Sequence, residues 1–331
     1  MKTLIKKNLY YENTFSGEVE VDYKMHPSGS DQSKPSTGKH LGGRGLIFGG
    51  YTPSPTIVDT IEFFNIGTMG SRAIDFGELT QTKGAGAVAS SGHRGIYAGG
   101  YGPSAKTDAM EYITFASAGN AVDFGGELTA AIYQLSSTSD GSRGIWFPGG
   151  PPSPPNVAQQ IEYVQISASG TDAADFGDIT EARRYGGASC NGYRAMHSGG
   201  VDTTVYNNNL EFITVGTNGN AVDIADLNFL SGYASCCDDS SRAVHFAGHP
   251  GPQDSIDYFN IGTESNASDF GEALSARPSG ATVSDGSRGL YAGGEPASDI
   301  VEYFQIGFPS NTVDYSELSA GNSTICGASG N

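Results

Sequence analysis

The sequence predicts a β-propeller of six blades, and three observations carry this prediction. An Arg followed by a small residue, apolar residues and usually Gly-Gly recurs along the chain. Three further strings recur between its copies, so each period of about 50 residues holds four strand patterns, which is typical of a propeller blade. The composition, with 48 Gly, 17 Tyr and 16 Phe in 331 residues, favours short strands and tight turns over helices.

The four strings of a period differ in the way that a wedge-shaped blade requires. Small residues, as in 87–90 (AVAS), fit the crowded strand next to the central channel. A third string joins an acidic to an aromatic residue, as in 61–64 (IEFF), and a fourth resembles DFGEL, as at 75–79; their aromatic rings fill the wider outer layers. Gly-Gly doublets are predicted to adopt backbone conformations closed to residues with a Cβ. The second string begins at Arg44, Arg94, Arg143, Arg194, Arg242 and Arg288.

The two ends of the repeat region indicate how the ring closes. The first copy starts directly with its Arg string and lacks the preceding small-residue string, whereas the chain ends on such a string at 323–331. We therefore expect residues 41–331 to form an all-β propeller whose first blade is completed by residues 322–331, which would remove an open sheet edge. Residues 1–40 share nothing with the repeat and are predicted to form an extended N-terminal arm.

The order of the strings resembles that of kelch propellers: a small inner strand, a strand ending in Gly-Gly, a strand with Glu and an aromatic residue, and an outer strand. The resemblance covers about residues 41–331, but DFGEL replaces the usual Trp-containing outer string. In that detail the chain looks more like Gly-rich propeller repeats of tailed bacteriophages of marine bacteria, a texture visible in residues 110–129 and 161–180. This second resemblance implies a virion component.

Charge and apolar content narrow the classes of partner and compartment. The net charge of −18 disfavours binding to nucleic acid through its phosphates. No apolar run is long enough to insert into a membrane, and the basic N-terminus is not followed by an apolar signal segment. The four Cys suggest no disulfide framework. We expect a protein made in a host cytoplasm and, by the bacteriophage resemblance, located in the virion.

Acidic residues recur in three sets of six, which opens two interpretations. Rings of carboxylates could form a catalytic or metal-binding array. Alternatively, each repeat Arg pairs with a carboxylate of its own or a neighbouring blade, and Asp side chains cap turns. A catalytic group needs one asymmetric place, so we favour the scaffold and expect no enzyme, cofactor or catalytic residue. Cys190, Cys236, His197 and His245 could bind zinc, but their registers hold packing residues in other blades, so we expect no metal.

Loop variation predicts one recognition surface. Connections between the second and third strings, and between one period and the next, should share a face, and they do not repeat, whereas the turns of the opposite face do. The aromatic rings and Arg hydrogen-bond donors of these loops suit binding to a glycan or a protein. The alternative is that the loops vary in sequence without binding any ligand. The candidate ligand-binding residues are Tyr51, Tyr101, Tyr133, Arg183, Arg184, Tyr185, Tyr206 and Phe229.

These observations favour a structural accessory protein of a bacteriophage particle, decorating the capsid or associated with the tail. Residues 1–40 would anchor it to other virion proteins, by adding a strand to a neighbour, and the variable face would bind a host surface glycan or protein. The arm could instead fold back on its own propeller. Two other functions stay open: a free kelch-like protein-interaction scaffold, and a glycan-active enzyme, which would need a non-repeating acid pair in the central pocket.

Overall fold

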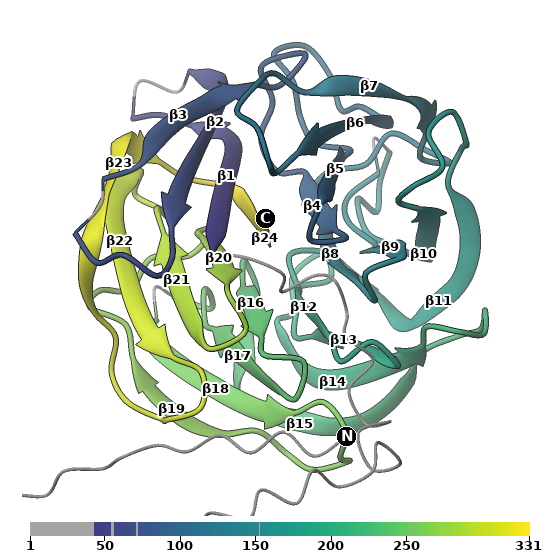
Figure 1. The fold of residues 1–331 in the computed structure, drawn as a ribbon. Helices are drawn as coiled ribbons and strands as arrows, with labels where there is room; N and C mark the ends of the chain where they lie inside the picture. Colours follow the sequence, from purple (N-terminus) through teal and green to yellow (C-terminus); the bar gives the residue numbers. More distant parts are fainter. Residues whose placement is uncertain (1–42, 54–55, 71, 152, 252) are drawn as a thin grey trace, which may run out of the picture. The chain divides into compact units, whose positions relative to one another are not determined.

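The structure is a six-bladed β-propeller, as the repeat predicts. The computed structural model describes residues 43–331 except 54–55, 71, 152 and 252. Within this part of the chain, six four-stranded antiparallel sheets are arranged around a common axis (Figure 1). The predicted arm, residues 1–40, lies outside the described residues.

Each blade has four strands, and we number the blades 1 to 6 by their second strands in chain order. The innermost strands are β24 (Cys326–Gly330), β4 (Ala87–Ser90), β8 (Ser136–Ser139), β12 (Gly187–Cys190), β16 (Ser235–Asp238) and β20 (Ala281–Ser284). The second strands are β1 (Arg44–Tyr51), β5 (Arg94–Ala98), β9 (Arg143–Phe147), β13 (Arg194–Ser198), β17 (Arg242–Phe246) and β21 (Arg288–Ala292). The third strands are β2 (Ile57–Asn65), β6 (Ala109–Thr114), β10 (Ala158–Gln165), β14 (Asn207–Thr214), β18 (Ser255–Asn260) and β22 (Ser298–Gln305). The outer strands are β3 (Ile74–Glu78), β7 (Val122–Glu127), β11 (Ala174–Arg183), β15 (Val222–Ser231), β19 (Ser268–Glu272) and β23 (Val313–Asn322).

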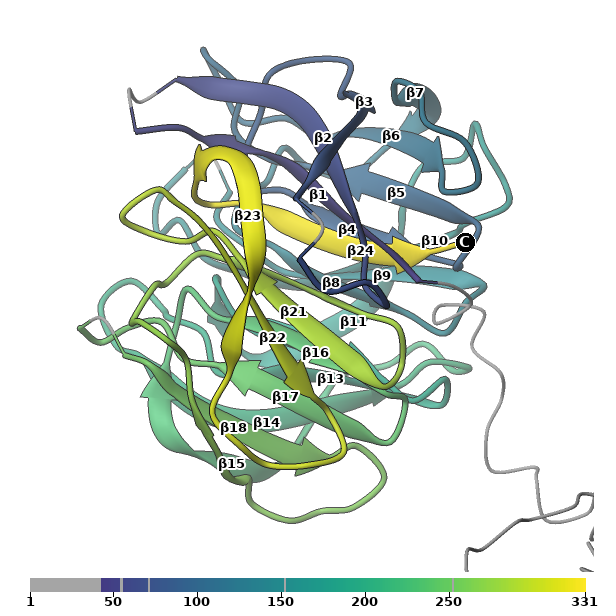
Figure 2. The same cartoon turned by 60° about the vertical axis from the view of Figure 1, so that its left-hand side comes forward.

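The C-terminal strand closes the ring, which confirms the prediction. Strand β24 pairs antiparallel with β1, with Leu46 opposite Ala328 and Phe48 opposite Cys326. Figure 2 shows this juxtaposition, the yellow β24 lying beside the purple β1. Blade 1 therefore joins the two ends of the repeat region within one sheet. The edge of β1 that faces the axis is paired with β24.

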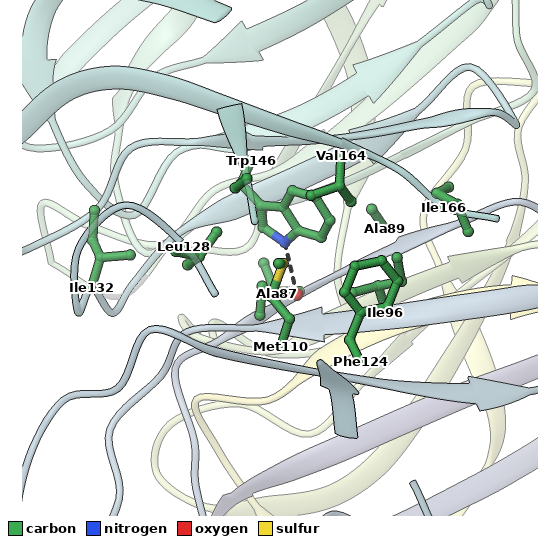
Figure 3. Packing of buried hydrophobic residues seen from close by; sticks show 12 residues of the cluster. Ala87, Ala89, Ile96, Met110, Phe124, Leu128, Ile132, Trp146, Val164 and Ile166 are labelled. Atoms are coloured by element: carbon green, nitrogen blue, oxygen red, sulfur yellow. Dashed lines mark hydrogen bonds between the residues drawn. The ribbon is translucent and has the colours of Figure 1, made fainter. Parts of the chain in front are cut away.

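The hydrophobic core is divided among the blade interfaces. Six clusters of buried apolar side chains each combine residues of two adjacent blades, and together they follow the ring. In the cluster between blades 2 and 3, Trp146 packs on Val164 and Leu128, and its indole N–H donates to the Ala87 carbonyl at 3.1 Å (Figure 3). Trp146 is buried in this interface, so its predicted placement in the core is confirmed.

The glycine doublets follow the prediction in four blades and depart from it in two. Gly49 and Gly50, for example, have φ of 54° and 107°, in the region that favours glycine. In blade 3, Gly149 does not have a positive φ; a Cβ there would instead collide with the Tyr133 carbonyl. Blade 5 has Ala247 and Gly248 in place of a doublet, and Gly248 approaches the backbone of blade 4's last connection in the same way.

The repeat arginines connect neighbouring blades, but not through the predicted carboxylates. Each guanidinium lies over an aromatic ring of its own blade, as Arg94 does over Tyr112 at 4.1 Å from the ring centroid. Five of them also donate to a backbone carbonyl of the next blade. Within the described chain only Arg194 among the six contacts a carboxylate, that of Glu264 at 3.2 Å. The predicted pairing is thus wrong for the other five, because the carboxylates of the third strands have a different donor.

Those carboxylates form a second belt around the ring. Each of the six is buried and accepts a hydrogen bond from a backbone N–H in the preceding blade's outer strand or just after it, at 2.6–3.0 Å. Thr80 of blade 1 donates to Glu111 of blade 2, and Ser319 of blade 6 donates to Glu62 of blade 1. The carboxylates are Glu62, Glu111, Glu162, Glu211, Asp257 and Glu302.

Deleting residues 322–331 tests the closure. The truncation removes β24 and leaves Leu46 and Phe48 without their partner strand, so the thermal unfolding midpoint is expected to fall by about 5 °C or more. Deleting Asn331 alone leaves β24 whole and serves as the control. Differential scanning calorimetry checks both, and equal midpoints for the two proteins would contradict closure by β24.

Candidate functional site

The variable face is formed by two sets of connections that the structure brings together. One set joins the second and third strands of a blade and comprises the described residues of 52–56, 99–108, 148–157, 199–206, 247–254 and 293–297. The other joins successive blades and comprises residues 79–86, 128–135, 184–186, 232–234, 273–280 and 323–325. Isolated β-bridges link the sets, as between Gly84 and Tyr101 and between Gly232 and His249. The prediction that both sets share a face is confirmed.

Three predicted site residues, Tyr51, Tyr101 and Tyr133, lie close together on this face. They come from blade 1, blade 2 and the connection to blade 3, and all three are half-buried. The rings of Tyr101 and Tyr133 are 6.1 Å apart between centroids and tilted by 49°. Burial raises the pKa of Tyr51, and the nearby Tyr101 and Tyr133 raise it further. The phenols therefore form one group, although they come from distant parts of the sequence.

Two basic side chains converge on the last of these rings. The Lys106 ammonium lies 4.1 Å from the Tyr133 ring centroid, and Arg184 donates from Nη1 to the Tyr133 hydroxyl at 3.0 Å. Lys106 also donates to the carbonyl of Pro151 at 2.7 Å. The sequence had singled out Tyr133 and Arg184 but not Lys106. The sequence offered one signal for Lys106: among the basic residues of the repeat region, it is one of those that do not belong to the repeat strings.

A second aromatic group continues across blades 4 and 5. Tyr185 stacks on Tyr233, with ring centroids 3.7 Å apart and planes inclined by 25°. Tyr233 meets His249 edge to face at 5.0 Å, and Tyr206 lies 6.1 Å from the same imidazole. Burial raises the pKa of Tyr185, so its hydroxyl stays protonated. Arg184 lies over the Tyr185 ring at 5.6 Å and thus connects this group with Tyr133.

Two predicted site residues lie elsewhere. Arg183 is fully buried at the end of β11 and forms an ion pair with Glu211, so its guanidinium is not on the variable face. Phe229 belongs to the outer strand β15 rather than to a loop, and its ring is 6.2 Å from that of the buried His245. Both follow from strand length: β11 and β15 each run for 10 residues and extend into segments that the sequence had suggested were loops.

Arg183 belongs to a set of buried cations at alternate blade interfaces. Lys83, Arg183 and Arg277 hold one equivalent position, three residues before Gly86, Gly186 and Gly280, and pair with Glu111, Glu211 and Glu302. At the other three interfaces the same position holds Ile132, Ser231 and Asn322. The odd-numbered blades therefore send a cation to the belt carboxylate of the following even-numbered blade, whereas the even-numbered blades do not.

Glu162, at an interface without a cation, and Glu211, which pairs with Arg183, differ in the direction of their pKa shifts. Burial raises the pKa of Glu162, and hydrogen bonds from Thr129 oppose this only in part. Burial acts in the same direction on Glu211, but hydrogen bonds from His197 and Thr180 and the charge of Arg183 outweigh it, so its pKa lies below the ordinary value. The buried pairs are thus part of the scaffold and not groups available to a ligand.

The histidines of the suspected zinc set have polar partners in the interior. The imidazole of His245 lies between Ser198, 2.9 Å from Nδ1, and Ser231, 2.8 Å from Nε2. His197 bonds Glu211 through Nδ1 at 2.9 Å. In the described part of the chain, no group of three or more His, Cys, Asp and Glu residues is placed to hold a metal ion.

The central channel holds two small cavities. One, of about 70 Å³, is lined by inner-strand residues, among them Ser90, Ser139, Asp238, Ser284 and Ser329. The other, of about 50 Å³, is lined by blade-to-blade connections, including Gln134, Tyr185 and Tyr233. Asp238 is the one carboxylate lining either cavity among the described residues, and it accepts from the backbone N–H groups of Cys190 and Ser240.

Two comparisons with known proteins found no relative of this chain. A scan against protein-family models finds no match, and a search of curated proteins finds none. The kelch-like and bacteriophage resemblances therefore rest on the repeat strings alone. Within the described residues, no helix has the length and apolar character to cross a membrane. The fold places the chain in a structural class, the ring scaffolds that present non-repeating loops on one face. This class is consistent with an interaction module.

Replacing Glu211 by Gln tests the buried ion pair. The variant leaves the Arg183 guanidinium buried without a countercharge, which should lower the free energy of unfolding by about 3 kcal/mol or more. Glu162→Gln is the matched control, because Glu162 occupies the same register without a cation and Gln can still accept from Thr129; about 1 kcal/mol is expected there. Urea titrations measure both, and similar losses would contradict the distinction between the interfaces.

The buried His245 predicts a pH dependence of stability. Burial, with a smaller effect of His197, lowers the pKa of His245 to about 3 from an ordinary value of 6.5. The unfolded chain therefore takes up a proton first as pH falls below 6.5, and at pH 5 this should cost about 2 kcal/mol.

Urea unfolding at pH 7.5 and pH 5 checks this cost. His245→Gln should lose about 2 kcal/mol less than the wild type over this interval, whereas His93→Gln, at an exposed turn, should behave as the wild type does. An unchanged pH dependence in His245→Gln would show that the imidazole is not held neutral by the fold.

Proposed function

We propose that the chain is a non-catalytic binding module that recognises a saccharide or protein with its variable face. The observation that carries this proposal is that different side chains hold the ring together and line the variable face. The repeated carboxylates and arginines are engaged in bonds between blades, whereas the non-repeating Tyr101, Tyr133, Lys106 and Arg184 gather on one face. A rigid ring that holds variable loops is a common way to build a recognition surface.

A glycan-active enzyme is less well supported. It would need two carboxylates that do not belong to the repeat and that face each other across the central pocket. Among the described residues the channel cavities hold Asp238 alone, and the backbone N–H groups of Cys190 and Ser240 already bond its two oxygens. These contacts favour a structural role for Asp238 within the inner strands.

We further propose that the protein is an accessory component of a bacteriophage particle, on the capsid or the tail. The support is the likeness of residues 110–129 and 161–180 to propeller repeats of marine phages. Residues 1–40, which share nothing with the repeat, would dock on other virion proteins, and the variable face would point outward. The second candidate is a free kelch-like interaction scaffold, favoured by the string order alone.

Mass spectrometry of gradient-purified particles tests the virion role. We expect the full chain to co-purify with particles at a fixed stoichiometry, and a version comprising residues 41–331 to be lost from them because it lacks the anchor. Detection only in the soluble lysate would refute the virion role. Full occupancy of the 41–331 version would refute anchoring by residues 1–40 while leaving the virion role in place.

A further inference from the structure

Lys106 and Arg184 differ from the other basic residues of the variable-face connections, among the described residues, in lacking a carboxylate partner. The six repeat arginines bridge blades, and Lys83, Arg183 and Arg277 form buried pairs with belt carboxylates. Arg72 forms an exposed pair with Glu317 at 2.7 Å. Within the described residues, neither Lys106 nor Arg184 has a carboxylate within ion-pair distance. Lys106 and Arg184 are thus the two basic residues of the variable face, among those described, that have no carboxylate partner; their bonds go to the Pro151 carbonyl and the Tyr133 hydroxyl.

Lys106 and Arg184 are also held near each other. Both contact Tyr133, Lys106 over its ring at 4.1 Å and Arg184 through its hydroxyl at 3.0 Å. Burial lowers the pKa of Lys106, and the positive charge of Arg184 lowers it further. Two like charges at close range repel each other, and a bound anion would offset this repulsion. In a chain with net charge −18, such a spot is a local exception to the field of the whole molecule.

The surroundings of the cations suit a sugar better than a protein. Tyr51 and Tyr101 lie beside them, and tyrosines offer flat faces for pyranose rings together with hydroxyls that bond to sugars. Tyr and Arg occur in protein interfaces too, but there they surround a well-packed, more apolar centre. No exposed large hydrophobic side chain of the described residues lies in the connections that hold Tyr101, Tyr133 and Arg184.

We propose that Lys106, Tyr133 and Arg184, with Tyr101 beside them, form a binding site for an anionic saccharide. The ligand would be a sugar chain that carries carboxylate or sulfate groups, with an acidic group between the ammonium and the guanidinium and a neighbouring ring against Tyr101. This inference rests on the proposed recognition role of the variable face and narrows it to one chemical class of ligand.

Biolayer interferometry of the full chain tests the site with four immobilised probes. Polygalacturonate carries carboxylates, dextran sulfate carries sulfates, dextran is the uncharged sugar, and poly-glutamate is an acidic chain without sugar. We expect at least one charged polysaccharide to bind at least about tenfold more tightly than dextran and poly-glutamate do. Which of the two binds then distinguishes a uronate from a sulfate ligand.

Single substitutions assign the binding to the site. Lys106→Gln and Arg184→Gln should each weaken binding of the charged polysaccharide by about tenfold, and Lys106→Arg should retain most of it. Arg72→Gln removes one positive charge outside the variable face and should have no effect. Unchanged thermal unfolding shows that a variant is folded. If a Gln variant does not fold, Lys106→Arg still provides a variant of the same site that keeps the positive charge.

Several outcomes would overturn the inference. Equal binding of dextran, insensitive to both Gln variants, would preserve a sugar-binding face but remove the anionic class. Equal binding of poly-glutamate would indicate an acidic peptide instead. A loss in Arg72→Gln as large as in Arg184→Gln would reduce the effect to overall charge, and no binding of either charged polysaccharide would refute the site. The co-purification experiment is independent, so each of these results leaves the virion role open to its own test.

Discussion

The architecture depends on one requirement, that a buried carboxylate must find its hydrogen-bond donors in another blade. Each of the six belt carboxylates is removed from water, which is costly unless donors replace the lost hydration. The donor is a backbone N–H in the outer strand of the preceding blade or just after it, as Thr80 is for Glu111. A blade is therefore satisfied only when its neighbour is in place. Since Ser319 of blade 6 serves Glu62 of blade 1, the requirement is met everywhere only in a closed ring.

This arrangement explains why the variable face can carry so much sequence variation. The carboxylate belt, the repeat arginines and the six interblade cores fix the ring, and the blade-to-blade connections contribute to it at a few positions such as Thr80 and Lys83. Connections such as 99–108 and 184–186 are then anchored at both ends by strands and by bridges such as Arg184 with Val201. Lys106 and Arg184 on these connections take no part in the carboxylate belt. Both contact Tyr133.

The sequence predicts the blade number, the strand order and the closure by β24 because these are written in repeated strings. It predicts less well what a single non-repeating residue does. Arg183 and Arg184 are adjacent in the sequence, yet one is buried against Glu211 and the other contacts Tyr133, because successive side chains of an extended segment alternate in direction. Aligning the blades by register would have grouped Arg183 with Lys83 as a scaffold residue. The proximity of Lys106 to Arg184 depends on tertiary contacts and has no counterpart in the linear pattern.

The alternation of cationic and neutral interfaces has a consequence for how such a chain can change in length. Because Lys83, Arg183 and Arg277 recur at every second blade, the unit of repetition is a pair of blades, and the ring has approximate threefold character inside its sixfold outline. Recombination that removes or duplicates one blade would set two interfaces of the same kind side by side, and could leave a buried charge without its partner. Steps of two blades preserve every pairing, so adding or removing a pair of blades should disturb this ring less than adding or removing one.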